Sequence, residues 1–188
     1  MDFSLDDALT RVRTYGDTVL QVRCRELDDF SKAAGVAAKL VDGLEREPNG
    51  IGLAANQIGL SVRAFSYDLR GTDDERSDFH GVCFNPVIVE TSGGSFYNEG
   101  CLSIPGLRWD IYRPEEIHVV GFDVDGNDVE FELDGLAARL FQHEIDHLDG
   151  KLILDRITDK GEHMSAVIEA ERLLRDLELQ RRVGMRFL

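Results

Sequence analysis

Cysteine is scarce in this chain of 188 residues, which has only Cys24, Cys83 and Cys101. An odd number of cysteines at wide spacing argues against a disulfide framework and favours a reducing compartment. Long apolar runs are also missing, so no segment is expected to span a bilayer. Residues 1–16 are acidic and match neither a signal peptide nor an arginine-rich transit peptide. We therefore expect a cytoplasmic protein with no membrane contact.

Positive charge is in short supply as well. The chain has 21 lysines and arginines against 36 acidic residues, which gives a net charge of -15 and a pI near 4.6. Such a charge argues against broad non-specific binding to nucleic acid, so no DNA partner is expected. Internal repeats and low-complexity linkers are absent from the sequence. We predict a single domain over residues 1–188, long enough for a substantial core.

Periodic apolar positions predict three helices and at least four strands. Helices are expected over residues 29–46, from an N-cap at Asp134 to near Gly150, and over about residues 161–182. Strands are expected at residues 62–69 and 81–90, with a hairpin at 116–133. The acidic stretch 70–81 is typical of a solvated loop. This order of elements indicates an α+β fold.

The same periodicity predicts which side chains face the core. In the first helix these are Phe30, Ala33, Ala37, Leu40, Val41 and Leu44. In the hairpin they are Val120, Phe122 and Val124, followed by Val129, Phe131 and Leu133. In the last helix they are Met164, Val167, Ile168, Leu174 and Leu177.

The stretch "FQHEIDHLDG" (141–150) contains the H-E-x-x-H pattern of metal-dependent hydrolases. Residues four apart share one face of a helix, so His143 and His147 can reach the same ion with Glu144 beside them. Leu136 and Leu140 continue this stripe, so the same face points to the core. Two histidines and a glutamate buried there without a metal would be hard to satisfy. The alternative is a helix whose histidines only pair with neighbouring side chains.

A catalytic site of this kind needs a third protein ligand. Ile153 stands where a metzincin would have its last histidine, which excludes that class. Glu169 lies near the spacing of the gluzincin glutamate, but it fits equally well as an exposed charge. Cys101 lies in "NEGCLSIPG", a loop-like segment outside the periodic apolar runs. Cys24 and Cys83 lie in strand-like apolar segments, where a cysteine usually serves packing.

Three segments together resemble the motifs of the peptide deformylase family. They are "GIGLAANQ" (50–57), "EGCLS" (99–103) and "QHEIDH" (142–147), and they occur in the family's order. The resemblance covers essentially the whole chain and is weakest over the first 45 residues and near Asp73. It implies antiparallel or mixed sheets packed around a central helix that carries the histidine motif. It also implies an N-terminal helix and the long C-terminal helix of the bacterial type.

The resemblance assigns a role to each position that matches a motif. It implies that Cys101, His143 and His147 hold the metal and that Glu144 is the general acid and base. Gln57 and the backbone N–H of Leu102 would bind the developing oxyanion. Gly50, Ile51 and Gly52 would line the peptide groove. Outside the motifs, the methionine side chain needs an apolar pocket beside the motif helix, for which Leu136 and Leu140 are candidates.

The implied substrate is a newly made peptide that begins with N-formyl-methionine. The implied cofactor is one Fe²⁺ per chain, which Zn²⁺, Ni²⁺ or Co²⁺ can replace. A monomer is expected, with transient ribosome contact through the C-terminal helix and its arginines. Two other functions stay open: a zinc endopeptidase with Glu169 as third ligand, and a non-catalytic binding protein of the same fold. The sequence leaves undecided whether Arg108 and Arg113 pair with Glu99 or lie on the surface.

Overall fold

The structure, a computed structural model, describes residues 11–74, 76 and 78–184, with only the helical backbone given for 180–184. The α-helices are α1 (Ala33–Glu45), α2 (Gly135–Leu148) and α3 (Lys160–Gly184). Short 3-10 helices are η2 (Thr18–Gln21), η3 (Phe30–Lys32), η4 (Ala55–Ile58) and η5 (Ile153–Arg156). The strands are β1 (Gly52–Ala54), β2 (Ala64–Asp68), β3 (His80–Ser92), β4 (Ser95–Cys101), β5 (Ile104–Arg113), β6 (Glu116–Phe122) and β7 (Asp128–Asp134).

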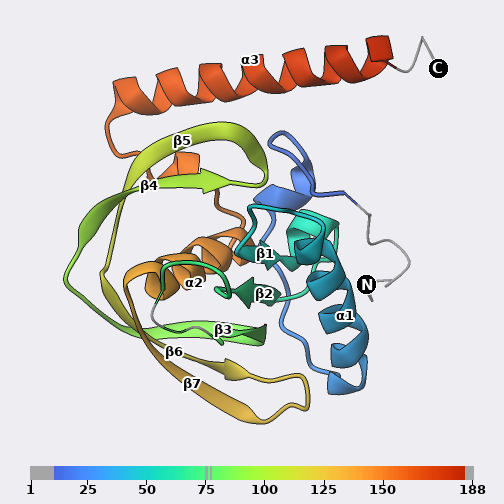
Figure 1. Ribbon diagram of the computed structural model, residues 1–188, viewed down its shortest axis with the longest axis vertical. Coiled ribbons are helices and arrows are strands. Elements are labelled where there is room, and N and C mark those ends of the chain that lie inside the picture. Colours follow the sequence, from blue (N-terminus) through green and yellow to red (C-terminus); the bar gives the residue numbers. More distant parts are fainter. Residues whose placement is uncertain (1–10, 75, 77, 185–188) are drawn as a thin grey trace.

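The strands form two antiparallel sheets. Five strands pair in the order β1-β2-β3-β6-β7, and β4 pairs with β5 in a separate hairpin. Figure 1 shows α2 between the five-stranded sheet and this hairpin, with α1 beside β1 and α3 running along the far side of the hairpin. The predicted α+β fold, with its central motif helix and its two outer helices, is confirmed.

Helix α2 is buried on nearly every side, because it lies between the five-stranded sheet and the β4–β5 hairpin. Its residue Phe141 contacts Phe65 edge to face, with ring centroids 4.9 Å apart, and it also contacts Tyr67 and Phe131. Charged side chains on the same helix are therefore also removed from water, and each needs a partner. This burial prepares the helix to carry a polar site at its centre. Among the described residues, no helix is both long and apolar enough to cross a bilayer.

Helix α1 holds the segment from β1 to η4 in place. Its buried residues are Ala33, Val36, Leu40 and Leu44, and they pack in one cluster with Leu53 and Ile58. The predicted helix is confirmed, but Val36 takes the core position expected for Val41, which is 41% exposed. The positions 33, 36, 40 and 44 form one stripe at the helical period, and Val41 lies to the side of it.

Several predicted faces are wrong. The hairpin β6–β7 forms as predicted, but Ile117 and Val119 are the buried side chains of β6, whereas Val120 and Phe122 are half-buried. Both faces of β6 are partly covered, because η3 places Phe30 against Phe122 at 5.4 Å between ring centroids. The burial of each side chain on such a strand depends on which elements pack against its two faces. Local periodicity does not reveal those elements.

Helix α3 is also placed differently from the prediction. Met164 and Ile168 are more than half exposed, while Ala166 and Ala170 are buried against the residues of β5 and η5. Small alanine side chains allow the helix to approach the hairpin closely, so the larger apolar residues lie off the contact line. Asp134 occupies the N-cap position of α2 but makes no capping hydrogen bond, because its carboxylate pairs with Arg76 at 2.6 Å.

Candidate metal centre

Three potential metal ligands meet between β4 and α2. Cys101, expected in a loop, is the last residue of β4, and His143 and His147 lie one turn apart on α2. The Cys101 Sγ lies 3.2 Å from the His147 Nε2, and one ligand atom from each residue falls within 4.8 Å of the others. Among the described residues, this is the group of histidine, cysteine and acidic side chains that converges in this way.

The donor set fits a tetrahedral transition metal. Typical zinc distances of about 2.3 Å to sulfur and about 2.1 Å to nitrogen place those two ligand atoms roughly 3.6 Å apart. The Cys101 Sγ and the His147 Nε2 lie 3.2 Å apart, close to that value, and all three ligand atoms lie within 4.8 Å of one another. One thiolate and two imidazoles form a soft set that favours iron, zinc, nickel or cobalt over magnesium or calcium. Three protein ligands also leave a position for water or substrate.

Protonation of the cluster is tightly coupled. Burial alone would raise the pKa of the Cys101 thiol, but His147 and His143 hold it well below its ordinary value. Burial opposes a charged His143, yet its bonds to Cys101 and Glu99 raise its pKa to about 10. The Cys101 thiolate and the His143 imidazolium therefore stabilise one another. A divalent cation would displace the His143 proton, since metal ligands bind in their deprotonated forms.

Glu99 orients the first histidine. It lies two residues before Cys101 on the same face of β4, and its Oε2 lies 3.2 Å from the His143 Nδ1. This contact leaves the Nε2 of His143 to face the cluster. Glu99 also accepts hydrogen bonds from Arg113 at 2.7 and 3.0 Å and from Arg139 at 2.7 Å. Burial would raise the pKa of Glu99, but His143 and Arg113 lower it to about 2.

The same arginine ties this network to the end of α2. Arg113, 2% exposed, also donates to the Asp146 Oδ2 at 2.7 Å, and Arg156 pairs with both oxygens of Asp146. Arg113 is thus a buried ion-pair residue. Arg108 is exposed and hydrogen-bonds Asn98, which answers the question that the sequence left open for both arginines.

Glu144 is the one carboxylate of the cluster without a strong partner. It is 4% exposed, and its buried Oε2 makes no hydrogen bond to the described residues. Burial raises the pKa of Glu144, against the opposing effect of His143 and His147. Gly52 leaves room for this carboxylate, because a Cβ there would lie 2.5 Å from the Glu144 Oε1. A buried carboxylate with a raised pKa and a free oxygen, such as that of Glu144, is suited to accept and release a proton.

Hydrogen-bond donors lie beside the cluster. The Gln57 side chain is buried, accepts from the backbone N–H of Ala54 at 2.8 Å and donates to the Ser103 Oγ at 3.1 Å. These two contacts fix the orientation of the amide at the edge of the cluster. Leu102 follows Cys101 directly in the turn between β4 and β5. Both residues line the cleft that opens onto the cluster.

That cleft has a volume of about 620 Å³. The sequence-predicted residues that line it are Gly50, Ile51, Gly52, Gln57, Cys101, Leu102, Leu136, Leu140, His143 and Glu144. His147, 1% exposed, lies beneath them. Tyr97, Glu99 and Arg139 also line the cleft, and no local pattern in the sequence predicted them there. Recognising residues 95–101 as a strand would have placed Tyr97 and Glu99 on the face of Cys101, because strand side chains alternate.

The other cysteines and Glu169 lie away from the cluster. Cys24 and Cys83 are buried in the core around Phe65, and burial raises the pKa of each thiol to about 12. Glu169 is exposed on α3 and does not join the converging ligand group among the described residues. The endopeptidase alternative therefore loses its third ligand, while the expected packing role of Cys24 and Cys83 fits their burial.

Comparison with known proteins agrees with this geometry. Residues 9–163 match the model of the polypeptide deformylase family. Peptide deformylase 2 of Streptomyces coelicolor is 42% identical over 161 residues, covering 84% of this chain and 89% of that protein. The crystal structure of peptide deformylase from Thermus thermophilus superposes with a TM-score of 0.75 at 39% identity, covering 88% of this chain and 94% of that one. A plant peptide deformylase gives a TM-score of 0.80 at 30% identity, covering 96% and 95%.

Proposed function

The chain belongs to the peptide deformylase family, a family of metal-dependent hydrolases that remove the N-terminal formyl group from nascent proteins, and from this premise we propose a role for each residue of its site. Cys101, His143 and His147 hold the metal. The observation that carries this assignment is the convergence of their ligand atoms within 4.8 Å at the inner end of a cleft.

Glu144 moves the proton during hydrolysis of the formyl amide. A bound divalent metal would lower the pKa of its water and polarise the formyl carbonyl. Glu144 accepts the proton of the attacking water and then delivers it to the leaving amine. Its partnerless oxygen and its raised pKa suit both steps, because the group can hold the proton between them.

Gln57 and Leu102 stabilise the negative charge that develops on the formyl oxygen. The Gln57 amide is held before the reaction by Ala54 and Ser103, so little reorganisation is needed when charge forms. The backbone N–H of Leu102 supplies the second donor. Donors fixed in this way can each contribute about 3 kcal/mol to transition-state stabilisation.

The substrate peptide binds along the cleft by its main chain. Strand β1 lies at the edge of the five-stranded sheet, and Gly50 and Ile51 lead into it. The backbone groups of Gly50, Ile51 and Gly52 that are not already bonded can pair with an added strand. The methionine side chain enters the apolar part of the cleft beside Leu136 and Leu140. Main-chain contacts accept most sequences, while the side-chain pocket selects the first residue.

The metal in the cell is Fe²⁺, with Zn²⁺, Ni²⁺ and Co²⁺ able to replace it, in keeping with the soft Cys-His-His donor set. The protein works in the cytoplasm as a monomer. It meets its substrate at the ribosome through α3, which is exposed along much of its length and carries Arg172 and Arg175. Arg181, Arg182 and Arg186 would add to this charge, but their side chains lie outside the described part of the chain.

The test is formate release from a formyl-Met-Ala-Ser peptide by protein purified without air, with metal analysis of the same sample. We expect turnover by the wild type and at least about a hundredfold loss in Glu144→Gln, the lower range for a general acid or base. The variant should keep its metal. Turnover near the wild-type rate in Glu144→Gln would contradict the role given to this residue. Absence of formate with the metal-loaded wild type would contradict the function.

A further inference from the structure

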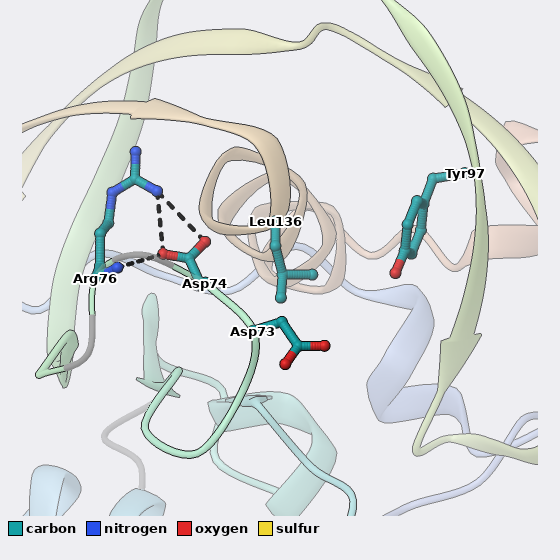
Figure 2. A pocket seen from close by; sticks show the side chains of 5 residues that line it. All are labelled: Asp73, Asp74, Arg76, Tyr97 and Leu136. Atoms are coloured by element: carbon teal, nitrogen blue, oxygen red, sulfur yellow. Dashed lines mark hydrogen bonds and ion pairs between the residues drawn. The ribbon is translucent and has the colours of Figure 1, made fainter.

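Many polar side chains around the cleft pair with one another. In the neighbouring cavity of about 510 Å³, for example, Arg76 hydrogen-bonds Asp74 at 3.2 Å (Figure 2). Two residues that do not line the cleft differ in this respect. The His147 Nδ1 and the Asn56 Oδ1 are both buried, and neither makes a hydrogen bond to the described residues. Buried polar atoms are rarely left unpaired, so each of these two atoms calls for a partner.

The two residues are in contact. Asn56 lies in η4 and is 0% exposed, and its Nδ2 donates a hydrogen bond to the backbone carbonyl of His147 at 2.5 Å. A carbonyl oxygen accepts hydrogen bonds and cannot donate one, so this contact fixes which way round the amide lies. The Oδ1 is bonded to the same carbon as the Nδ2. The free acceptor of Asn56 therefore lies in the immediate surroundings of His147.

Metal binding would make the His147 Nδ1 a hydrogen-bond donor. The Nε2 of His147 is the ring atom that faces Cys101, 3.2 Å from its Sγ, so it is the atom that would bind the metal. A neutral imidazole that binds a metal through Nε2 carries its proton on Nδ1 and almost always donates it to an acceptor. His143 follows this rule, because its Nδ1 lies 3.2 Å from Glu99. The Nδ1 of His147 contacts no acceptor among the described residues.

We propose that Asn56 is a positioning residue for the metal centre. Its Nδ2 holds the last turn of α2 through the His147 carbonyl, and its Oδ1 accepts the Nδ1–H of the same histidine when the metal is bound. This inference rests on the proposed function, because it takes His147 to be a metal ligand. The short helix η4 then serves the site twice, since Gln57, the next residue, holds its amide at the edge of the cleft.

Glu144 is a competing acceptor for the same proton. Its buried Oε2 also lacks a partner among the described residues, and it lies on α2 three positions before His147. Glu144 lines the cleft, however, whereas neither His147 nor Asn56 does. Asn56 is the better candidate, because it already contacts His147 and has no part in the proton transfer assigned to Glu144.

The Nδ1 protons of the ligand histidines report this contact directly. Protein with isotope-labelled histidine would be loaded with zinc, whose filled d shell leaves NMR signals sharp. In the wild type we expect the Nδ1–H resonances of His143 and His147 to lie downfield and to exchange slowly with water. Asn56→Leu should shift the His147 resonance upfield or broaden it by exchange and leave that of His143 in place. Asn56→Ala serves if the leucine variant folds poorly.

Zinc affinity gives a second readout. Competition with a chelator should show the affinity lowered about 10- to 100-fold in Asn56→Leu, the usual cost of losing such a partner. Asn56→Asp keeps an acceptor oxygen, so it should keep a downfield His147 resonance. Ser66→Ala is the matched control, because Ser66 is 1% exposed and its hydroxyl donates to the Leu40 carbonyl on α1 at 3.2 Å. It loses one buried hydrogen bond and should keep both resonances and the affinity.

Three results would overturn the inference. The first is a wild-type His147 resonance with wild-type zinc affinity in both Asn56→Leu and Asn56→Ala. The second is a His147 resonance that moves in Glu144→Gln but not in Asn56→Leu, which would make Glu144 the partner. The third is an equal loss of affinity in Asn56→Leu and Ser66→Ala, because the effect would then be one of general stability. If zinc left the histidine resonances of the wild type unchanged, the proposed metal site itself would fail.

Discussion

At the scale of single residues, the chemistry depends on what each side chain lacks as much as on what it contacts. Glu144 lacks a hydrogen-bond partner at Oε2 among the described residues, and Gly52 lacks the Cβ that would collide with it. All three cysteines are buried and free, so Cys101 differs from Cys24 and Cys83 only in the side chains around it. Two histidines lower the pKa of one thiol, while apolar burial raises the pKa of the other two.

Replacement of Cys101 by alanine should remove most of the bound metal, because two histidines alone form a weak site for a soft cation. Cys24→Ala and Cys83→Ala should keep the metal, since both thiols lie in the apolar core away from the ligand atoms. Metal content of the three purified variants decides the matter. Full occupancy in Cys101→Ala would rule out the Cys-His-His site.

Replacement of Gly52 by alanine should lower kcat without loss of metal. The new Cβ would lie 2.5 Å from the Glu144 Oε1 and 2.6 Å from the Leu140 Cδ1, so the carboxylate must move. A displacement of about 1 Å at a catalytic group can cost about a hundredfold in rate. Gly161→Ala is the control and should keep the wild-type kcat. It lies in the first turn of α3, where the added Cβ would lie 3.3 Å from the exposed Asp159 carboxylate. Wild-type kcat in Gly52→Ala would mean that Glu144 does not need its observed position.

At the scale of elements, a buried ion network joins the hairpin β4–β5 to helix α2. Arg113 on β5 bonds both Glu99 on β4 and Asp146 on α2, and Arg139 on α2 bonds Glu99 and Ser95 on β4. Buried charges of this kind contribute specificity of arrangement more readily than net stability. Their position explains how a cysteine on a strand stays in register with two histidines on a helix.

Replacement of Arg113 by methionine should lower the free energy of unfolding by about 3 kcal/mol, because Glu99 and Asp146 would each lose a buried cation. Arg139 and Arg156 still pair with those carboxylates, which keeps the loss at the lower end of the usual range. Urea denaturation measures the difference. Arg108→Met, an exposed position on the same strand, should change stability by less than about 0.5 kcal/mol. Equal effects of the two substitutions would show that the network is not coupled to folding.

At the scale of the whole molecule, the chain is strongly acidic, and the candidate metal centre lies inside it beside a buried network of ion pairs. The net charge of -15 disfavours non-specific contact with other polyanions. The ion network at the centre depends on Glu99 and Asp146, whose lowered pKa values reflect their ionised pairs. Two conditions therefore act on the molecule as a unit: pH, through the buried carboxylates, and oxygen, through the metal and its thiolate.

Acid should destabilise the metal-free protein between about pH 5 and pH 2. The pKa of Glu99 is lowered from 4.5 to about 2, so its contribution to stability is complete above the unfolded value and is lost as the pH falls through the folded value. The size of this contribution is roughly 3 kcal/mol. The lowered pKa of Asp146 acts in the same direction. Urea unfolding at pH 6 and pH 3 checks this, and equal stability at both would contradict the assigned ion pairs.

Air should inactivate the iron-loaded protein and spare the nickel- or cobalt-loaded protein. A site with an open position gives oxygen access to ferrous iron, and the thiolate of Cys101 is also oxidisable. Zinc has no redox chemistry of its own. One metal-free preparation, loaded with each metal in turn, would be followed for activity in air and under argon. Equal decay of the iron and nickel forms would argue against iron oxidation as the cause. An iron form that is inactive from the start, beside an active zinc form, would contradict iron as the cofactor.

The sequence by itself determined the features that depend on residues close together in the chain: the main helices, one hairpin, the histidine pair and the family motifs. The four-residue spacing of His143 and His147 places them on one helix face. The three motifs identify the family and indicate Cys101 and Gln57 as candidate site residues. The main helices and the hairpin β6–β7 also follow from repeating apolar positions. Residues a few positions apart are related by the geometry of one element, so one chain suffices to infer their relation.

Only the tertiary structure decided which distant residues meet. Cys101 and His147 are 46 positions apart, and Glu99 and His143 are 44 apart, so no local period relates them. The buried faces of β6 and α3, the arginines that hold Glu99 and the place of Asn56 beside His147 likewise depend on how the sheets pack against α2. Side-chain burial there follows from what covers each face, and that cover comes from elements far along the chain.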